Sequence, residues 1–281
     1  MRVTIFGASG LLGKTLMHEW SGDTVTGLSS RDGDIRDAKR VRQVVLETGP
    51  EWIVLAAAYT DVDGCERNPE LAFAVNRDGA AHVAAAAKEV GARLVFLSSD
   101  YVFDGRKATP YETTDERNPQ SVYGRTKAEA EITLLELMPE CCIARTSWLF
   151  GTGGKCFPDT ILKLAASRPA LDVVNDQRGC PTYAVDLARA IVQLCRKNAS
   201  GIVHVTNAGD CSWFEFAEEI VRSAGLATPV RPVSSQQMAR PAPRPAYSVL
   251  SQATVQALGI EMPSWRDALR RYLEQRQEPA T

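Results

Sequence analysis

Three glycines near the start of the chain constrain its fold more than any other feature. Gly7, Gly10 and Gly13 follow the apolar run 3–6 at once and open a helix-length segment, 11–20. A strand, a glycine loop and a helix in this order are what a dinucleotide-binding turn requires, because the loop backbone and the helix N-terminus together bind a pyrophosphate. A tight turn without a ligand is the alternative. The context favours a parallel sheet that binds a nucleotide at this turn.

Short apolar runs alternate with helix-length segments through the first half of the chain, which is typical of parallel strands joined by crossover helices. We expect five strands, at 3–6, 24–28, 52–57, 93–97 and 142–146. We expect the helices between them at 11–20, 37–48, 70–90 and 120–137. An amphipathic helix at 184–196 and a strand at 201–206 then return to the sheet. The predicted fold class is α/β, with a doubly wound, mostly parallel Rossmann sheet.

The pattern changes after residue 150, where an irregular stretch begins at 151–154 and a proline-rich segment follows at 240–245. We expect a smaller, discontinuous C-terminal α/β domain that binds the substrate. The predicted NAD(P)-binding domain comprises 1–150 plus about 182–206, and the predicted substrate domain comprises 151–181 plus about 207–281.

Composition narrows the class of function. The 281 residues are 44% apolar and 23% charged, and the net charge is −2 with both signs interspersed. No basic stripe marks a surface for nucleic acid or an anionic membrane. The N-terminal apolar run is too short for a signal peptide, and no apolar stretch approaches the roughly 20 residues that span a bilayer. We therefore expect a cytoplasmic protein that acts on a small molecule, with neither nucleic acid nor membrane as a partner.

Cysteine and histidine usage argues against a resident metal. The seven cysteines are scattered without a C-x-x-C spacing, and the three histidines lie far apart. We expect the cysteines to be reduced and mostly buried rather than paired in disulfides. No group has the spacing of a metal site, so we expect no intrinsic catalytic metal.

A tyrosine and a lysine four residues apart indicate the chemistry. Tyr123 and Lys127 fall within the expected helix 120–137, where residues at this spacing share a face. A neighbouring ammonium favours the phenolate and would lower the tyrosine pKa from about 10, which would make Tyr123 a usable proton donor or acceptor. Ser99 ends an expected strand at the sheet edge where ligands bind in open α/β folds. Each residue alone could be structural, but together with the glycine loop they favour proton transfer to a carbonyl.

The end of the second expected strand distinguishes the two dinucleotides. A carboxylate there accepts from the ribose hydroxyls, whereas a cation accommodates a 2′-phosphate. Arg31 and the two serines before it favour NADPH, although Asp32 leaves NADH open. Asp34 and Ile35 are expected beside the adenine.

Longer segments carry a family resemblance. Ser99, Tyr123 and Lys127 together resemble the extended short-chain dehydrogenase/reductase superfamily. Five segments narrow this to a resemblance to the dTDP-4-dehydrorhamnose reductase family: SSDYVFDG (98–105), YGRTKAEAE (123–131), ARTSWLFG (144–151), QRGCPTYAVDLARAI (177–191) and RPAYSVLS (244–251). They are spread over essentially the whole chain, which makes this match far more specific than the glycine loop.

The resemblance implies roles at the chemical end. Tyr123 is expected to be the proton donor, Lys127 to hold the nicotinamide ribose and lower the tyrosine pKa, and Ser99 to stand where the family usually has threonine. Asn76 resembles a helix asparagine of these enzymes. The full set of expected cofactor-binding residues is Gly7, Gly10, Leu11, Leu12, Gly13, Arg31, Asp34, Ile35, Ala57, Ala58, Tyr59, Asn76, Tyr123 and Lys127.

The resemblance also implies a substrate site. Besides Ser99, Asp100 and Trp148 match positions that contact the deoxysugar, and the Trp148 ring would offer it an apolar face. Arg244 is expected at the nucleotide diphosphate, because an arginine fork suits phosphate oxygens.

The implied activity is the NADPH-dependent reduction of the C4 ketone of dTDP-4-dehydro-6-deoxy-L-mannose to dTDP-L-rhamnose, which supplies polysaccharide biosynthesis. Two alternatives stay open: a reductase of another nucleotide 4-keto-deoxysugar, and a non-catalytic regulatory subunit similar to the β subunit of methionine adenosyltransferase. Some relatives form a dimer linked by Mg²⁺ through acidic surface residues. No such residues can be assigned in this sequence, so a Mg²⁺ ion and a homodimer are both left open.

Overall fold

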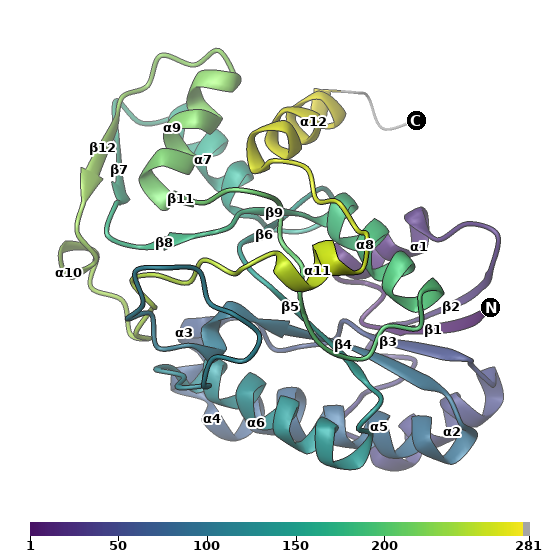
Figure 1. Ribbon diagram of the computed structural model, residues 1–281. Coiled ribbons are helices and arrows are strands. Elements are labelled where there is room, and N and C mark those ends of the chain that lie inside the picture. The colour runs from purple at the N-terminus through teal and green to yellow at the C-terminus, as the bar shows by residue number, and fades with distance from the viewer. Residues whose placement is uncertain (278–281) are drawn as a thin grey trace.

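A computed structural model describes residues 1–277, and a six-stranded parallel sheet runs through its centre (Figure 1). The strand order is β10-β5-β4-β3-β1-β2. The strands are β1 (Arg2–Phe6), β2 (Thr24–Leu28), β3 (Trp52–Leu55), β4 (Arg93–Ser99), β5 (Cys142–Thr146) and β10 (Gly201–His204). The order changes direction at β1, which has β2 on one side and β3 on the other. Ligands of open α/β sheets bind at such a switch point, beyond the carboxyl ends of the strands.

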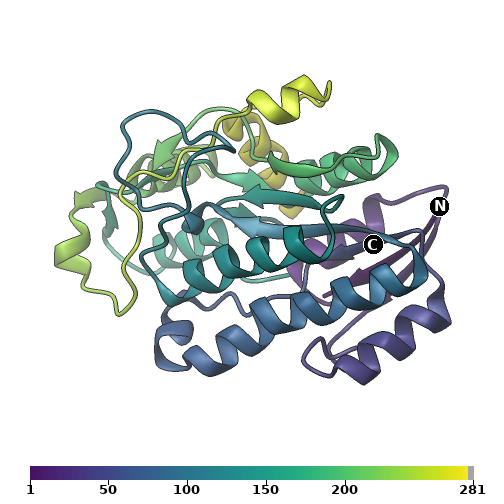
Figure 2. The same cartoon turned by 60° about the horizontal axis from the view of Figure 1, so that its bottom comes forward.

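Helices cover both faces of the sheet. One face carries α2 (Ala38–Thr48), α5 (Gly79–Val90) and α6 (Val122–Leu137), which form the lower layer of Figure 1. Figure 2 brings this layer forward, and α5 contacts both α2 and α6. The other face carries α1 (Leu11–Glu19) and α8 (Ala184–Arg196), which pack on each other. The two faces bury separate apolar clusters, which explains why the strands read as continuous apolar runs.

The segment 70–90 differs from the single helix that we expected. It is divided into α4 (Pro69–Phe73), a π-helical turn η1 (Ala74–Asp78) and α5. The reason is the buried side chain of Asn76, which accepts from Tyr59 N at 2.8 Å and donates to Tyr59 O at 3.1 Å and to Thr126 Oγ1 at 3.0 Å. π-Turns of this kind are frequent at functional sites. Here the turn ties the segment after β3 to helix α6.

The remaining elements form a second layer above one end of the sheet (Figure 1). Its two-stranded pairs are β6 (Leu149–Phe150) with β9 (Thr182–Tyr183), β7 (Leu171–Val174) with β12 (Val230–Val233), and β8 (Arg178–Gly179) with β11 (Cys211–Ser212). Its helices are α7 (Phe157–Ala165), α9 (Trp213–Ser223), α10 (Ser235–Met238) and α12 (Trp265–Gln277). Helix α11 (Ala253–Ala257) instead packs on β10 of the central sheet. An aromatic cluster that includes Phe150, Phe216, Trp265 and Tyr272 forms much of the core of the second layer.

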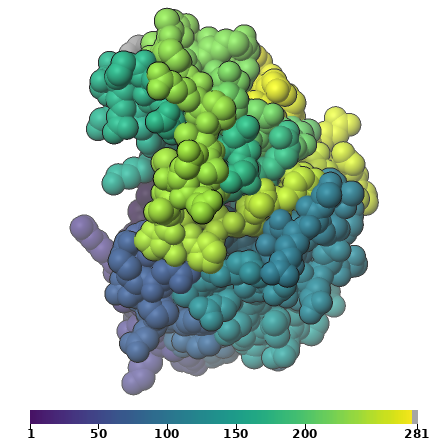
Figure 3. All heavy atoms as spheres, turned by 90° about the vertical axis from the view of Figure 1, so that its left-hand side faces the viewer, coloured from purple at the N-terminus to yellow at the C-terminus, as the bar shows by residue number. Residues whose placement is uncertain are grey.

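The segment after β12 returns to the first half of the chain. In Figure 3 it is the yellow-green band that reaches the blue residues of α3 (Val62–Arg67). Ala242 N donates to Asp63 Oδ1 at 3.1 Å, and Arg244 Nη2 donates to Asp63 Oδ2 at 3.0 Å. Chain segments about 180 residues apart are thus joined beside the carboxyl ends of the strands.

All seven cysteines are free and buried, as expected from their spacing. Within residues 1–277, no group of three or more His, Cys, Asp or Glu side chains could hold a metal ion. Across the same residues, every helix is too short or too polar to cross a membrane.

Candidate active site

The glycine loop joins β1 to α1 in the expected way. Gly7 has a φ of 89°, and its N–H donates to Leu28 O at 2.9 Å. A Cβ at Gly13 would lie 2.1 Å from Gly7 O, and one at Gly7 would lie 2.6 Å from Ala57 N. Gly10 occupies the N-cap of α1. The glycines therefore let the loop, the next strand end and the helix approach closely, which is the shape that a pyrophosphate needs.

A cavity of about 300 Å³ lies at this loop, across the carboxyl ends of β1, β2 and β3. Six of the predicted cofactor residues line it: Gly7, Gly10, Asp34, Ile35, Ala57 and Ala58. Ser30, one of the two serines that favoured NADPH, lines it too. The other lining residues were missed: Ser9, Gly33, Arg36, Ala56 and Val75. The lining of backbone, small side chains and one apolar wall suits a dinucleotide.

Of the residues that we expected to select the dinucleotide, Ser30 lines the cavity and Arg31 does not. The side chain of Arg31 is exposed and is not part of the cavity lining. Both carboxylate oxygens of Asp34 accept from Arg36, at 3.0 Å from Nε to Oδ1 and 2.6 Å from Nη2 to Oδ2. The Arg36 guanidinium thus neutralises the carboxylate at the rim of the cavity.

Helix α6 presents Tyr123 and Lys127 toward the end of β4. Ser121 caps the helix by accepting from Gly124 N at 3.1 Å, so Tyr123 lies in the first turn. Lys127 Nζ is buried, donates to Leu97 O at 2.8 Å and lies 4.6 Å from the centre of the Phe96 ring. Helix α6 therefore begins near the carboxyl ends of the strands, where ligands bind in open α/β sheets, and the Lys127 hydrogen bond holds it against β4.

Ser99, at the end of β4, lies near the Tyr123 phenol. Desolvation by burial raises the tyrosine pKa well above its ordinary value, while the nearby Ser99 hydroxyl acts in the opposite direction. Burial also lowers the pKa of Lys127 to about 8. The expected fall in the tyrosine pKa is therefore not found in the protein by itself, because desolvation of the phenol outweighs the effects that lower the pKa. Tyr123 is protonated at neutral pH, as a proton donor must be.

Asp100 lies behind the serine. Its carboxylate is buried, and Oδ1 accepts from Ser99 Oγ at 2.9 Å. Within residues 1–277, Oδ2 has no hydrogen-bond partner. Desolvation raises the pKa of Asp100 to about 6, and the hydroxyls of Ser248 and Ser99 offset part of this rise. A buried carboxylate oxygen without a partner is costly, so this atom is suited to accept from a bound hydroxyl group.

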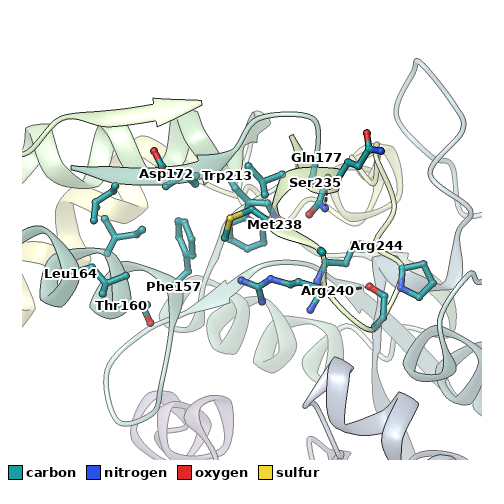
Figure 4. A pocket seen from close by; sticks show the side chains of 18 of the residues that line it. Phe157, Thr160, Leu164, Asp172, Gln177, Trp213, Ser235, Met238, Arg240 and Arg244 are labelled. Atoms are coloured by element: carbon teal, nitrogen blue, oxygen red, sulfur yellow. Dashed lines mark hydrogen bonds between the residues drawn. The ribbon is translucent and has the colours of Figure 1, made fainter. Parts of the chain in front are cut away.

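A second cavity of about 620 Å³ lies between α7, β7, α9 and the segment after β12 (Figure 4). Phe157, Leu164, Trp213 and Met238 give it apolar walls, and Tyr101 connects it to the end of β4. The ring of Tyr101 meets that of Tyr123 edge to face, with centroids 5.5 Å apart. The cavity therefore adjoins the tyrosine that we predict to be catalytic.

Three arginines line this larger cavity: Arg168, and on the segment after β12 Arg240 and Arg244, which Figure 4 labels. Arg244 was predicted; besides its ion pair with Asp63, it donates to Ala242 O at 2.9 Å. Arg240 was missed, and Figure 4 shows its side chain extending toward Phe157. Guanidinium groups in a largely apolar cavity suit a ligand with a ring and an anionic group.

Trp148 does not line the larger cavity itself, but its stacking partner does. The rings of Trp148 and Trp213 are 3.5 Å apart and 7° from parallel. Trp148 has a φ of 46°, and a Cβ at Gly179 would lie 2.6 Å from its ring. Trp148 comes two residues after Thr146, and Thr146 pairs with Ser99 in the sheet. Trp213 was missed because its role depends on contact with a residue 65 positions earlier; the capping box that opens α9 at Ser212 marks only the helix start.

Comparison with known proteins gives the family. The model of the RmlD substrate binding domain matches residues 1–278. The chain belongs to this family. A dTDP-4-dehydrorhamnose reductase of Streptomyces griseus is 42% identical over 95% of this chain and 91% of that protein. A dTDP-4-keto-6-deoxy-D-glucose reductase of Streptomyces niveus is 39% identical over 95% of each.

The crystal structure of a dTDP-4-dehydrorhamnose reductase from Bacillus anthracis, in complex with NADP, superposes with a TM-score of 0.95. It is 39% identical and covers 98% of this chain and 99% of that one. The likeness therefore extends over both the sheet and the second layer.

Proposed function

We propose that this protein is a dTDP-4-dehydrorhamnose reductase, which uses NADPH to reduce the C4 ketone of dTDP-4-dehydro-6-deoxy-L-mannose to dTDP-L-rhamnose. The observation that carries the proposal is the position of Tyr123 and Lys127 on α6, which the Lys127–Leu97 hydrogen bond fixes against β4. Ser99 ends that strand, and a cavity large enough for a sugar nucleotide lies beside it. The names of the full-length relatives support the same reaction.

The smaller cavity is the proposed NADPH site. The glycine loop would hold the pyrophosphate at the N-terminus of α1, with Asp34 and Ile35 on the adenine side and Ala57 and Ala58 toward the nicotinamide. Bound there, NADPH supplies the hydride. The Lys127 ammonium gives one of its three N–H groups to Leu97 O, which leaves donors for the ribose hydroxyls.

Tyr123 would give its proton to the oxygen that becomes negative at C4. Its raised pKa keeps the phenol protonated until the alkoxide forms. Ser99 would donate to the same oxygen after turning from Asp100, and a donor of this kind typically contributes about 2.7–4 kcal/mol to the transition state. The positive charge of Lys127 would then stabilise the phenolate that is left on Tyr123.

The larger cavity is the proposed site of the nucleotide and sugar. Arg240 and Arg244 would bind the diphosphate, and Trp148, held by Trp213, would face the deoxysugar with Asp100. This assigns cofactor binding to residues 1–150 plus about 182–206 and substrate binding to the rest. A cytoplasmic location and a homodimer stay predictions from sequence.

The experiment that tests the reaction compares wild type with Tyr123→Phe in the oxidation of NADPH by the keto sugar nucleotide. Loss of the acid should lower kcat by about 10²–10⁴-fold, while the affinity for NADPH stays close to that of wild type. Tyr183→Phe is the matched control, because it removes a hydroxyl that donates to Gln275 at 2.6 Å in the second layer. Full turnover by Tyr123→Phe would refute the mechanism.

A second candidate is reduction of a different nucleotide 4-keto-deoxysugar, which the name of the Streptomyces niveus relative favours. Ser99, Tyr123 and Lys127 do not distinguish the two substrates, because the wall of the pocket sets which sugar binds. Turnover of dTDP-4-keto-6-deoxy-D-glucose in preference to dTDP-4-dehydrorhamnose would replace the first proposal by the second. Binding of NADPH without turnover of either sugar would favour the regulatory subunit.

A further inference from the structure

A fully buried glutamate lies one helical turn beyond Lys127 and takes no part in the steps above. Glu131 has an exposed fraction of 0%. Its Oε1 accepts from Ser98 Oγ at 2.5 Å and from Arg145 Nε at 2.9 Å. Its Oε2 accepts from Arg145 Nη2 and from Arg117 Nε, each at 2.6 Å. Four charge-assisted hydrogen bonds of this kind fix the carboxylate firmly.

Two of the three partners of Glu131 come from β4 and β5, the strands whose carboxyl ends lie at the proposed site of reduction. Ser98 immediately precedes Ser99 in β4, and Arg145 pairs with Ser98 across the sheet in β5. Arg117 comes from the loop before α6. The carboxylate thus fastens α6 to β4 and β5, one turn from Lys127 and one residue from Ser99.

We propose that Glu131 is a positioning residue for the reduction proposed above: its carboxylate holds α6 in register against β4, so that Tyr123 faces Ser99, and it is the anion that keeps Lys127 charged. A role of this kind needs a charge and not only a hydrogen-bond acceptor. The expected effect of Glu131 on turnover rests on the proposed function, but its effect on the titration of Lys127 can be measured without substrate.

The charged and titratable groups around Lys127 support this assignment. Burial lowers the pKa of Lys127 to about 8, and the Glu131 carboxylate opposes that shift more than any other charge. Cys65 on α3 acts in the same direction, but burial raises its own pKa to about 11, so it is a neutral thiol at neutral pH. On the β4 side, Lys127 meets an uncharged carbonyl and the Phe96 ring.

Further charged and titratable groups lie nearby. His204 of β10 lies 3.3 Å from Arg145 Nη1, and burial lowers its pKa to about 3, so it is neutral at neutral pH. Asp100, beyond the end of β4, acts on Tyr123 and Tyr101. Arg145 of β5 and Arg117 of the loop before α6 both donate to the Glu131 carboxylate, which projects from α6. Desolvation raises the pKa of Glu131, but the hydrogen bonds from Arg145, Ser98 and Arg117 outweigh it and keep the group ionised. Without this carboxylate, Lys127 would share the protein interior with two uncompensated guanidinium groups.

The first test uses a pair of variants with opposite expected signs. Glu131→Gln keeps the shape of the side chain and removes its charge, and the alkaline limb of the kcat–pH profile should move to lower pH by about one unit. Arg117→Gln removes a guanidinium that is 23% exposed and leaves the carboxylate in place, so the limb should move to higher pH. Glu129→Gln, two residues earlier in α6 and paired with Arg77 at the surface, is the control and should leave the limb unchanged.

The second test measures Lys127 directly in the protein without ligands. The eight lysines are labelled with ¹³C at Cε, the Lys127 resonance is identified by its loss in Lys127→Arg, and its titration is followed by NMR. The titration midpoint should fall in Glu131→Gln and rise in Arg117→Gln. Breaking a buried ion pair is strongly destabilising, so Glu131→Gln is first checked by thermal unfolding. If it does not fold, Arg117→Gln carries the test.

The outcomes separate the inference from the proposed function. Lower melting temperatures with unchanged titration midpoints and unchanged pH limbs would overturn the inference and leave Glu131 a structural residue. Wild-type protein that turns over no keto sugar would overturn the proposed function, whereas the NMR titration would still decide whether Glu131 keeps Lys127 charged.

Discussion

The two cavities of this protein are built in opposite ways. The smaller one, at the glycine loop, is lined by short segments that directly follow β1, β2 and β3, and backbone geometry gives it its shape. The larger one gathers side chains from α7, β7, α9 and the segment after β12, together with Tyr101 from the first half of the chain. The comparison teaches that a site made by close backbone approach depends on a few glycines, whereas one made by side chains depends on contacts between distant segments.

The largest expected effect on this comparison is from Gly13→Ala. The new Cβ would lie 2.1 Å from Gly7 O, so the loop must move away from the helix. Overpacking of this kind destabilises by about 1–3 kcal/mol, and we expect NADPH binding to be lost with it. Urea unfolding and a fluorescence titration with NADPH measure the two effects. Gly10→Ala is the control, because its nearest contact is 3.3 Å and its cost in stability should be smaller. A Gly13→Ala protein as stable as wild type would show that the backbone does not decide the shape of this cavity.

An intermediate effect is expected from Trp213→Ala in the larger cavity. The change removes the ring that stacks on Trp148 at 3.5 Å. Such a stack contributes about 0.5–1.5 kcal/mol beyond the buried area, so KM for the sugar nucleotide should rise by up to about tenfold. Steady-state kinetics measure KM, and Trp213→Phe, which keeps an aromatic ring, should recover most of the loss. NADPH affinity should stay unchanged; an equal loss there would mean that the two cavities are not independent.

The smallest effect is expected from Arg31→Ala at the rim of the nucleotide cavity. Its side chain is exposed, and exposed ion pairs contribute little, so NADPH affinity should fall by less than about fivefold. NADH affinity should not change, since NADH has no 2′-phosphate. In the companion variant Arg36→Ala, Asp34 loses its guanidinium partner and becomes available to ribose hydroxyls, so NADH should bind more tightly. Unchanged preference in Arg31→Ala would remove this residue from the proposed cofactor site.

Sequence reasoning succeeded where the signal is local. Strands β2 and β5 and helix α8 begin and end as predicted, because apolar periodicity and turn residues mark them within the segment itself. The glycine loop was predicted for the same reason, because it directly follows a strand and opens a helix.

The rest depends on contacts that no short pattern encodes. The π-turn at Asn76 exists because the side chain bonds the backbone of Tyr59, 17 residues earlier. Trp213 lines the larger cavity and stacks on Trp148, a contact between residues far apart in the sequence. The tyrosine pKa was predicted in the wrong direction because residue spacing gives the neighbours of the phenol but not its burial.

The most direct test of the account is the oxidation of NADPH, followed by its absorbance, when the purified protein meets dTDP-4-dehydrorhamnose, with NADH compared in parallel and the product identified. We expect rapid oxidation, faster with NADPH, and dTDP-L-rhamnose as the product. NADPH that binds tightly and is not oxidised in the presence of this sugar nucleotide would contradict the account.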